Sequence, residues 1–138
     1  MPKKVSARKK LTLREQRDLD IEIGFMEGVI KKAPQYVDAL QVLGDAYTRR
    51  GKFVDGLKID EQLSQLRPND PTVFYNLACS YSLTKRYEDG ISALAQAIDC
   101  GYKDFKWLLR DPDLASLRQH PLFKGIQEKI KRVKIRVR

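Results

Sequence analysis

Histidine and cysteine are scarce in this sequence of 138 residues, which contains one histidine and two cysteines. A single histidine, His120, leaves few candidates for general acid–base catalysis, and the sequence has no glycine-rich phosphate loop and no GxSxG motif. Cys79 and Cys100 do not form a CxxC pair, so we expect no zinc site and two reduced cysteines. The sequence therefore predicts a protein that is not an enzyme and that holds no metal ion or cofactor.

Long apolar runs are also absent. The sequence has no run of 18 apolar residues, so no segment is predicted to span a membrane. The first ten residues, MPKKVSARKK, are charged and lead into no apolar stretch, which predicts no secretory signal. Together with the reduced cysteines, these absences favour a cytoplasmic location.

The net charge of +9 is concentrated at the two ends of the chain. Residues 1–10 carry +5 and residues 124–138 carry +6, whereas the residues between them carry −2. Such ends can bind nucleic acid, an anionic lipid surface or an acidic protein patch, or they can serve solubility alone. We expect basic tails at residues 1–11, which we predict to be disordered, and at residues 134–138. The basic residues of interest are Lys3, Lys4, Arg8, Lys9, Lys10, Lys131, Arg132, Lys134, Arg136 and Arg138.

A period of 34 residues runs through the middle of the chain. Under this period Pro34 returns as Pro68, Leu43 as Leu77, Tyr47 as Tyr81 and Gly56 as Gly90. A fixed period in this range is typical of arrays in which each supersecondary unit buries its apolar face against its neighbours. We expect Tyr47 and Tyr81 to be largely buried, facing small residues at the start of the next helix. Because such arrays present a surface, the period predicts a binding protein.

The residues inside the period resemble the tetratricopeptide repeat (TPR). The similar residues are Leu43-Gly44-x-x-Tyr47 with Gly51, Gly56 and Pro68, and then Leu77-Ala78-x-x-Tyr81 with Tyr87, Gly90 and Ala97. The resemblance implies an all-α superhelix of helix-turn-helix units, with two full repeats at about 37–70 and 71–102. It also implies a TPR domain at 12–133 that ends in a C-terminal cap at 103–133, as in small bacterial TPR proteins.

Apolar periodicity and helix-end residues predict seven helices. Thr12 and Glu15 predict a capping box at the start of an N-terminal capping helix. Asp70 is expected to be an N-cap residue with Pro71 at the first helical position. The predicted helices are 13–32, 37–50, 53–66, 71–84, 87–99, a short helix after Asp111, and a last helix at about 121–131 that starts after His120. Residues 133–138 alternate between apolar and basic side chains, which is compatible with a strand or a frayed helix end, and we favour a flexible tail.

In TPR proteins the first helix of each repeat lines a concave groove, so the resemblance implies groove positions in this chain. They are Gln41, Asp45 and Arg49 in the first repeat, Thr72, Tyr75, Asn76 and Cys79 in the second, and Lys106 and Arg110 in the cap. Asn76, Lys106 and Arg110 match three of the five polar positions with which chaperone-binding TPR domains hold a C-terminal carboxylate. Gln41 and Asp45 depart from the other two, and Asp45 is expected to repel a carboxylate.

We therefore predict an adaptor or scaffold protein that binds a peptide or protein, including an acidic one, in the groove. A second possibility is an RNA- or ribosome-associated protein that binds nucleic acid through its basic termini. A third is a structural subunit of a homo-oligomer. We expect the chain to be a monomer or a homodimer.

Overall fold

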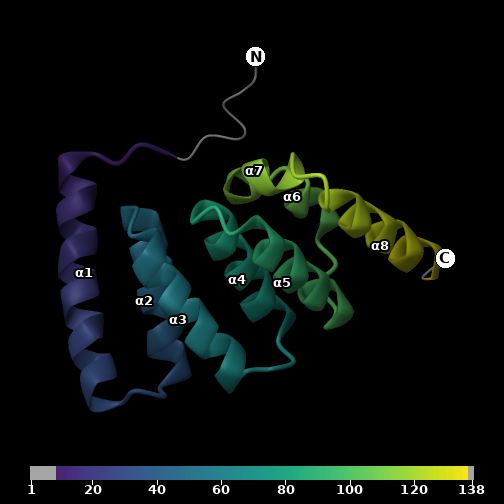
Figure 1. Ribbon diagram of the computed structural model, residues 1–138. Helices are drawn as coiled ribbons and strands as arrows, with labels where there is room; N and C mark the ends of the chain where they lie inside the picture. The colour runs from purple at the N-terminus through teal and green to yellow at the C-terminus, as the bar shows by residue number, and fades with distance from the viewer. Residues whose placement is uncertain (1–8, 137–138) are drawn as a thin grey trace. The chain divides into compact units, whose positions relative to one another are not determined.

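The computed structural model describes residues 9–136, and all regular structure in this range is helical (Figure 1). The described residues form eight α-helices and one 3-10 turn, η2, which confirms the predicted all-α fold class. None of these helices is long and apolar enough to cross a membrane. Contacts divide the chain into two compact units, of which the first is Lys9–Pro68 and the second begins at Asn69.

The first unit contains the helices α1 (Leu13–Lys32), α2 (Val37–Arg50) and α3 (Phe53–Leu66), whose bounds are those predicted. The middle helix, α2, packs against both α1 and α3 (Figure 1). The predicted capping box is present at the start of α1, where the Glu15 N–H donates to Thr12 Oγ1 at 3.1 Å. In return the Thr12 N–H donates to the Glu15 carboxylate at 2.9 Å. These reciprocal bonds satisfy two backbone donors that the helix start would otherwise leave unpaired.

One buried cluster of the first unit lies between α1 and α2. It contains the buried side chains of Leu19, Ile23, Leu43, Ala46 and Tyr47, so the predicted burial of Tyr47 is confirmed. Leu11 packs against the same cluster. The predicted disorder of residues 1–11 is therefore wrong at Leu11, because this apolar side chain covers the end of the core. Residues 1–8 lie outside the described residues.

Glycines allow α2 and α3 to approach closely, as their small size predicts. A Cβ atom at Gly56 would lie 2.8 Å from Thr48 Oγ1, and one at Gly44 would lie 3.1 Å from Ile59 Cγ2. The first distance is too short for any side chain without movement of the threonine. A larger residue at either position would push the two helices apart.

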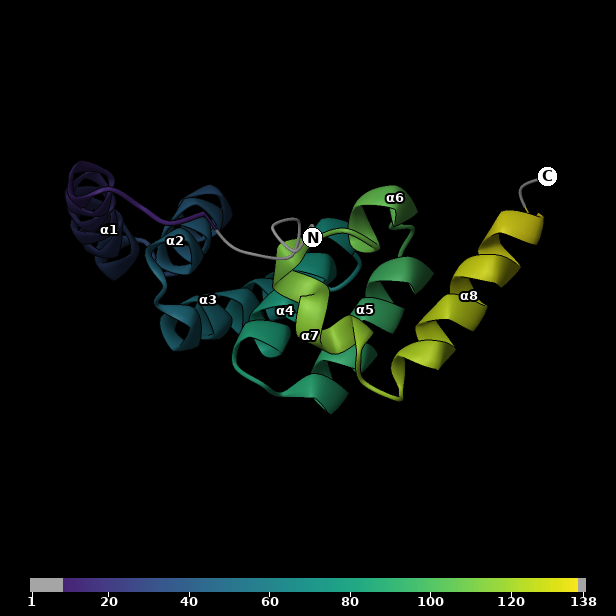
Figure 2. The ribbon, with the colours of Figure 1, turned by 90° about the horizontal axis from the view of Figure 1, so that it is seen from above.

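The second unit contains α4 (Pro71–Leu83), α5 (Tyr87–Asp99), α6 (Phe105–Leu108), η2 (Pro112–Leu114), α7 (Ala115–Arg118) and α8 (Phe123–Arg136). The helices α4 and α5 form a packed pair; η2 and α7 contact α4, and α8 lies beside α5 (Figure 2). Asp70 caps α4 by accepting from the N–H groups of Thr72 and Val73, with Pro71 at the first helical position, as predicted.

Tyr81 in the second unit is half-buried, in line with the prediction that it is largely buried. A Cβ atom at Gly90 would lie 3.4 Å from Tyr81 Cβ, which places the tyrosine against the expected small residue. The Arg86 guanidinium lies 4.8 Å from the centroid of the Tyr81 ring. This cation–π contact is favourable at the surface and lets the ring remain partly exposed.

The C-terminal segment departs from the prediction at two helices. The four-residue helix α6 was not predicted, and α8 continues to Arg136. The flexible tail predicted for residues 134–138 is therefore wrong as far as residue 136, and residues 137 and 138 lie outside the described residues. Helical spacing explains the extension: Phe123, Ile126 and Ile130 are buried, and half-buried Val133 continues the same stripe by another turn.

Candidate peptide-binding surface

The three predicted groove residues of the first unit lie on one exposed face of α2. Gln41, Asp45 and Arg49 follow one another at four-residue spacing, and all three are exposed. Arg49 Nη1 lies 3.6 Å from Asp45 Oδ2, which is an i,i+4 ion pair. Part of the negative charge that we expected to repel a carboxylate is therefore compensated within α2.

A depression of about 250 Å³ adjoins Arg49 in the first unit. It is lined by Leu11, Glu15, Asp18, Leu19, Glu22 and Arg49. The hydrogen bond from the Thr12 N–H, assisted by Lys9, holds the pKa of Glu15 below its usual range and so keeps it charged. The lining carries three acidic side chains against one cation, Arg49, and Lys9 pairs with Glu15; the negative charge that remains disfavours an acidic ligand in the first unit.

The predicted groove residues of α4 divide into an exposed pair and a buried pair. Thr72 and Asn76 are exposed one turn apart. Tyr75 is only 5% exposed and Cys79 only 8%, so the prediction that they line a groove is wrong. The C-terminal segment covers this part of α4, and Tyr102 stacks on Tyr75 with ring centroids 4.2 Å apart and planes at 7°.

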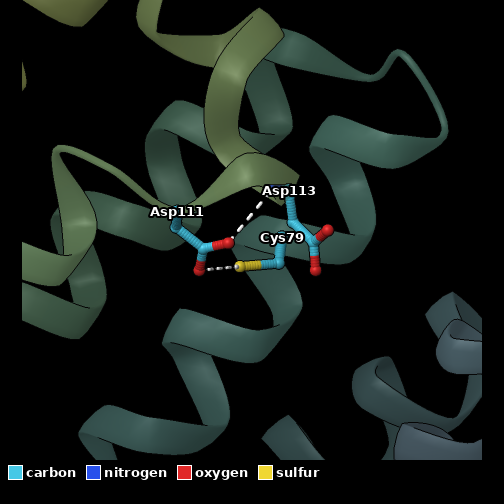
Figure 3. A group of neighbouring side chains, drawn as sticks. All are labelled: Cys79, Asp111 and Asp113. Carbon is cyan, nitrogen blue, oxygen red and sulfur yellow. Dashed lines mark hydrogen bonds between the residues drawn. The ribbon is translucent and has the colours of Figure 1, made fainter. Parts of the chain in front are cut away.

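The buried pair, Tyr75 and Cys79, hydrogen-bonds to Asp111, which is itself only 5% exposed. The Tyr75 hydroxyl donates to Asp111 Oδ2 at 2.7 Å, and the Cys79 thiol donates to the same oxygen at 3.7 Å. Asp111 Oδ1 accepts from the Asp113 N–H at 3.0 Å, and Figure 3 shows this carboxylate between Cys79 and the start of η2. Burial raises the pKa of the Tyr75 hydroxyl, with Cys79 and Asp111 acting in the same direction, so Tyr75 remains a donor.

Two residues that the sequence analysis missed complete this arrangement. Arg118 Nη1 donates to the carbonyl oxygens of Leu108 and Asp111, both at 2.9 Å. Burial lowers the pKa of Arg118, while the nearby Asp111 charge opposes this shift, as expected for a cation beside a buried carboxylate. Tyr102 reaches Tyr75 because Gly101, at φ 113°, turns the chain after α5. Gly101 was the sequence signal from which the position of Tyr102 could have been predicted. No feature of the sequence indicated the contacts of Arg118.

Cys79, Asp111 and Asp113 bring three possible metal ligands within 4.8 Å of one another (Figure 3). A Zn²⁺ ion would require a cysteine thiolate and free carboxylate lone pairs at about 2.0–2.3 Å. Here the Cys79 thiol donates a hydrogen bond, and both Asp111 oxygens already accept hydrogen bonds. The bonding of these groups is that of a structural hydrogen-bond network, which fits a metal ion poorly. That the protein holds no metal stays a prediction.

The buried network positions exposed polar side chains around it. Asn76 follows Tyr75 in α4 and Arg110 precedes Asp111, so the Tyr75–Asp111 hydrogen bond joins the two segments that carry these exposed residues. The Arg110 guanidinium lies 6.0 Å from the centroid of the Trp107 ring. We call the four exposed residues Thr72, Asn76, Lys106 and Arg110 the α4–α6 surface. Two of these four residues are cations, which suits an anionic ligand; the acidic N-cap residues Asp70 and Asp104 lie two residues before Thr72 and Lys106.

The basic residues predicted as tails lie mostly on α8 where they are described. Lys131, Arg132, Lys134 and Arg136 are all exposed on this helix. Near the N-terminus, Lys10 is exposed and Lys9 Nζ lies 3.3 Å from the Glu15 carboxylate. The remaining predicted tail residues, Lys3, Lys4, Arg8 and Arg138, lie outside the described residues.

Comparison with known proteins finds a similarity to a plant protein. A protein of Arabidopsis thaliana whose name describes it as chloroplastic is 35% identical to this chain over 112 residues. The match covers 75% of this chain and 33% of that protein, so the chain corresponds to about a third of its relative's length. No protein-family model matches the chain, and no solved structure matches it.

Proposed function

We propose that this chain is a non-enzymatic interaction module of the TPR type that binds a peptide or protein through the α4–α6 surface. The observation that carries the proposal is the buried 2.7 Å hydrogen bond between Tyr75 and Asp111. It holds the segments of Asn76 and Arg110 in a fixed relation while both side chains stay exposed. Fixing the two segments removes the backbone share of the conformational entropy that binding would cost, while the exposed Lys106 and Arg110 side chains still lose rotamer freedom.

The chemistry of the α4–α6 surface supports an acidic peptide as the ligand. Arg110 offers a planar guanidinium that can hold a carboxylate through two parallel hydrogen bonds. Lys106 adds a compact positive charge, and the Asn76 amide can donate to a carboxylate or to a peptide carbonyl. The depression of the first unit is lined mainly by acidic side chains, which repel an acidic peptide, and this supports placing the ligand on the second unit.

Membership of the TPR family is part of the proposal. The 34-residue period and the helix bounds that follow it support this membership, as does the close approach of helices at Gly44, Gly56 and Gly90. A role without catalysis is supported at the buried network, because the Cys79 thiol is held as a donor to a carboxylate. A thiolate would be needed for a cysteine nucleophile.

A binding titration with peptides that end in acidic residues tests the proposal. Charge-assisted hydrogen bonds contribute about 1.5–3 kcal/mol, so Asn76→Ala and Arg110→Ala should each weaken binding by roughly ten-fold or more. Arg67→Ala, an exposed arginine of the first unit, is the charge-matched control and should leave affinity unchanged. If both variants of the surface bind as tightly as the native chain, the ligand does not lie there.

A second candidate, nucleic-acid binding through the basic ends, is favoured by the four exposed cations Lys131, Arg132, Lys134 and Arg136 on α8. Binding of this kind falls with salt, with a log–log slope of about 0.7–0.9 per phosphate neutralised. Neutralising all four residues should flatten that slope for any RNA sequence. An affinity that does not change with salt would exclude this candidate.

The cytoplasmic location and the oligomeric state also belong to the proposal. The name of the relative places that protein in the chloroplast, so fractionation of the native cells is the direct test of location. Sedimentation equilibrium should give a monomer or a homodimer. A larger assembly would favour the structural-subunit interpretation.

A further inference from the structure

A second depression, of about 560 Å³, lies between the end of α6 and one side of α8. It is lined by Leu109, Lys124, Gln127, Glu128, Ile130 and Lys131, and we call it the α8 depression. It shares no residue with the α4–α6 surface. We propose that the α8 depression is a separate docking site for an acidic amphipathic helix of a partner protein.

The floor of the α8 depression is apolar. Leu109 is 44% exposed, although the preceding Leu108 is fully buried. Ile130 is buried and marks where α8 meets the rest of the unit. A large exposed apolar side chain beside a concave surface with charged edges is typical of a protein interaction site. A leucine of the partner would remove Leu109 from water and so favour association.

The rim of the α8 depression is cationic. Lys124 and Lys131 are seven residues apart, so they lie two turns apart on the same side of α8, separated by about 10.5 Å along its axis. Among the described residues neither lysine has an ion-pair partner, whereas Lys129 on another side of α8 is paired with Asp99 at 2.7 Å. Glu128, four residues after Lys124, is the acidic residue of the lining and reduces the positive potential there. Because neither Lys124 nor Lys131 is paired among the described residues, both are available to a ligand.

The apolar floor and the cationic rim of the α8 depression together determine which class of partner it can bind. A helix with acidic residues at i and i+7 and leucines at i+3 and i+4 presents all four side chains on one face. Laid along α8, such a helix would set its carboxylates at the spacing of Lys124 and Lys131 and its leucines on Leu109. A nucleic-acid backbone would use the exposed Arg132 and Arg136 equally and would gain nothing from Leu109.

The test is a titration of the isotope-labelled full chain with a synthetic 16-residue helix of this pattern, followed by amide chemical shifts and by fluorescence anisotropy. Shifts should centre on Leu109 and on α8 between Lys124 and Lys131. Exposed ion pairs are weak, so Lys124→Gln and Lys131→Gln should each weaken binding by about two- to five-fold. Leu109→Ser should weaken it by about ten-fold, because it removes the apolar floor. Glu128→Gln should strengthen it.

Arg132→Gln removes one charge from α8 outside the depression and is the matched control. If it weakens binding as much as Lys124→Gln does, or if Leu109→Ser has no effect, the helix senses only net charge and the proposal is wrong. Shifts centred elsewhere, or displacement of the helix by RNA with equal loss for every α8 cation, would also overturn it. Asn76→Ala should leave this affinity unchanged, so failure of the α8 depression and failure of the α4–α6 surface can be told apart.

Discussion

The hydrogen bond between Tyr75 and Asp111 should contribute measurably to the stability of the second unit. Tyr75→Phe removes the hydroxyl and retains the ring that stacks on Tyr102. Asp111 Oδ2 then keeps only the weak thiol donor of Cys79 at 3.7 Å, while Asp111 remains buried. Loss of a buried hydrogen bond to a charged group costs about 1.5–3 kcal/mol, so we expect the free energy of unfolding to fall by about 2 kcal/mol.

Thiol labelling gives a local readout of this change. In a Cys100→Ser background Cys79 is the remaining thiol, and it is buried beside Asp111. Its labelling requires the C-terminal segment to open from α4. A cost of about 2 kcal/mol corresponds to a roughly 30-fold faster labelling rate when opening is in rapid equilibrium. A urea titration of the same variant, followed by circular dichroism, should give the matching loss of stability.

Tyr36→Phe provides the control, because the Tyr36 side chain is 51% exposed in the first unit. It should change stability by less than about 0.5 kcal/mol and leave the labelling of Cys79 unchanged. If Tyr75→Phe behaves like Tyr36→Phe in both assays, then the hydrogen bond does not hold the C-terminal segment on α4. The structural basis for the α4–α6 surface would then be lost.

Glycine substitutions and acid titration supply further tests in the first unit. Gly28→Ala should raise the free energy of unfolding by about 0.5–1 kcal/mol, because no neighbouring atom outside the backbone of α1 lies within 4 Å of the new Cβ. A urea titration measures this change, and a loss of stability would contradict the prediction. Gly56→Ala should instead destabilise the chain, because its Cβ would lie 2.8 Å from Thr48 Oγ1; a gain equal to that of Gly28→Ala would refute the close approach. The hydrogen bond from Arg50 holds the pKa of Asp20 below its ordinary value of 3.8. The stabilisation by this pair is therefore complete above the unfolded pKa and lost as the pH falls through the lower folded value. The stability difference between the native chain and Asp20→Asn should shrink on acidification below about pH 4, and a constant difference would contradict the pairing.

The bounds of the first five helices could be predicted because their end signals are local. Thr12 with Glu15, Asp70 with Pro71, and Gly101 each act within a few residues of the helix end that they mark. Such signals need no knowledge of distant contacts.

The burial of Tyr75 and Cys79 could not be predicted in the same way. The resemblance to the TPR placed both residues on an exposed face of α4. Their covering residue, Asp111, lies 36 residues after Tyr75 and 32 residues after Cys79. No local pattern in α4 encodes a contact at that separation.

The end of α8 shows a conflict between two periodicities. Val133 and Ile135 alternate with basic residues, which is typical of a strand. Val133 also continues the buried stripe of Ile126 and Ile130 at helical spacing, and packing of that stripe on α5 decides the outcome. Because the helix continues through Ile135, this side chain lies off the buried stripe and is exposed.

The most direct test of the proposed function is recovery of a partner from the native cells at low and high salt, with the full chain and its Asn76→Ala/Arg110→Ala double variant in parallel. An interaction module predicts discrete polypeptides that the native chain retains at high salt and that the double variant loses. RNA bound only at low salt, or the loss of no polypeptide from the double variant, would contradict binding through the α4–α6 surface; partners of the α8 depression are expected on both chains.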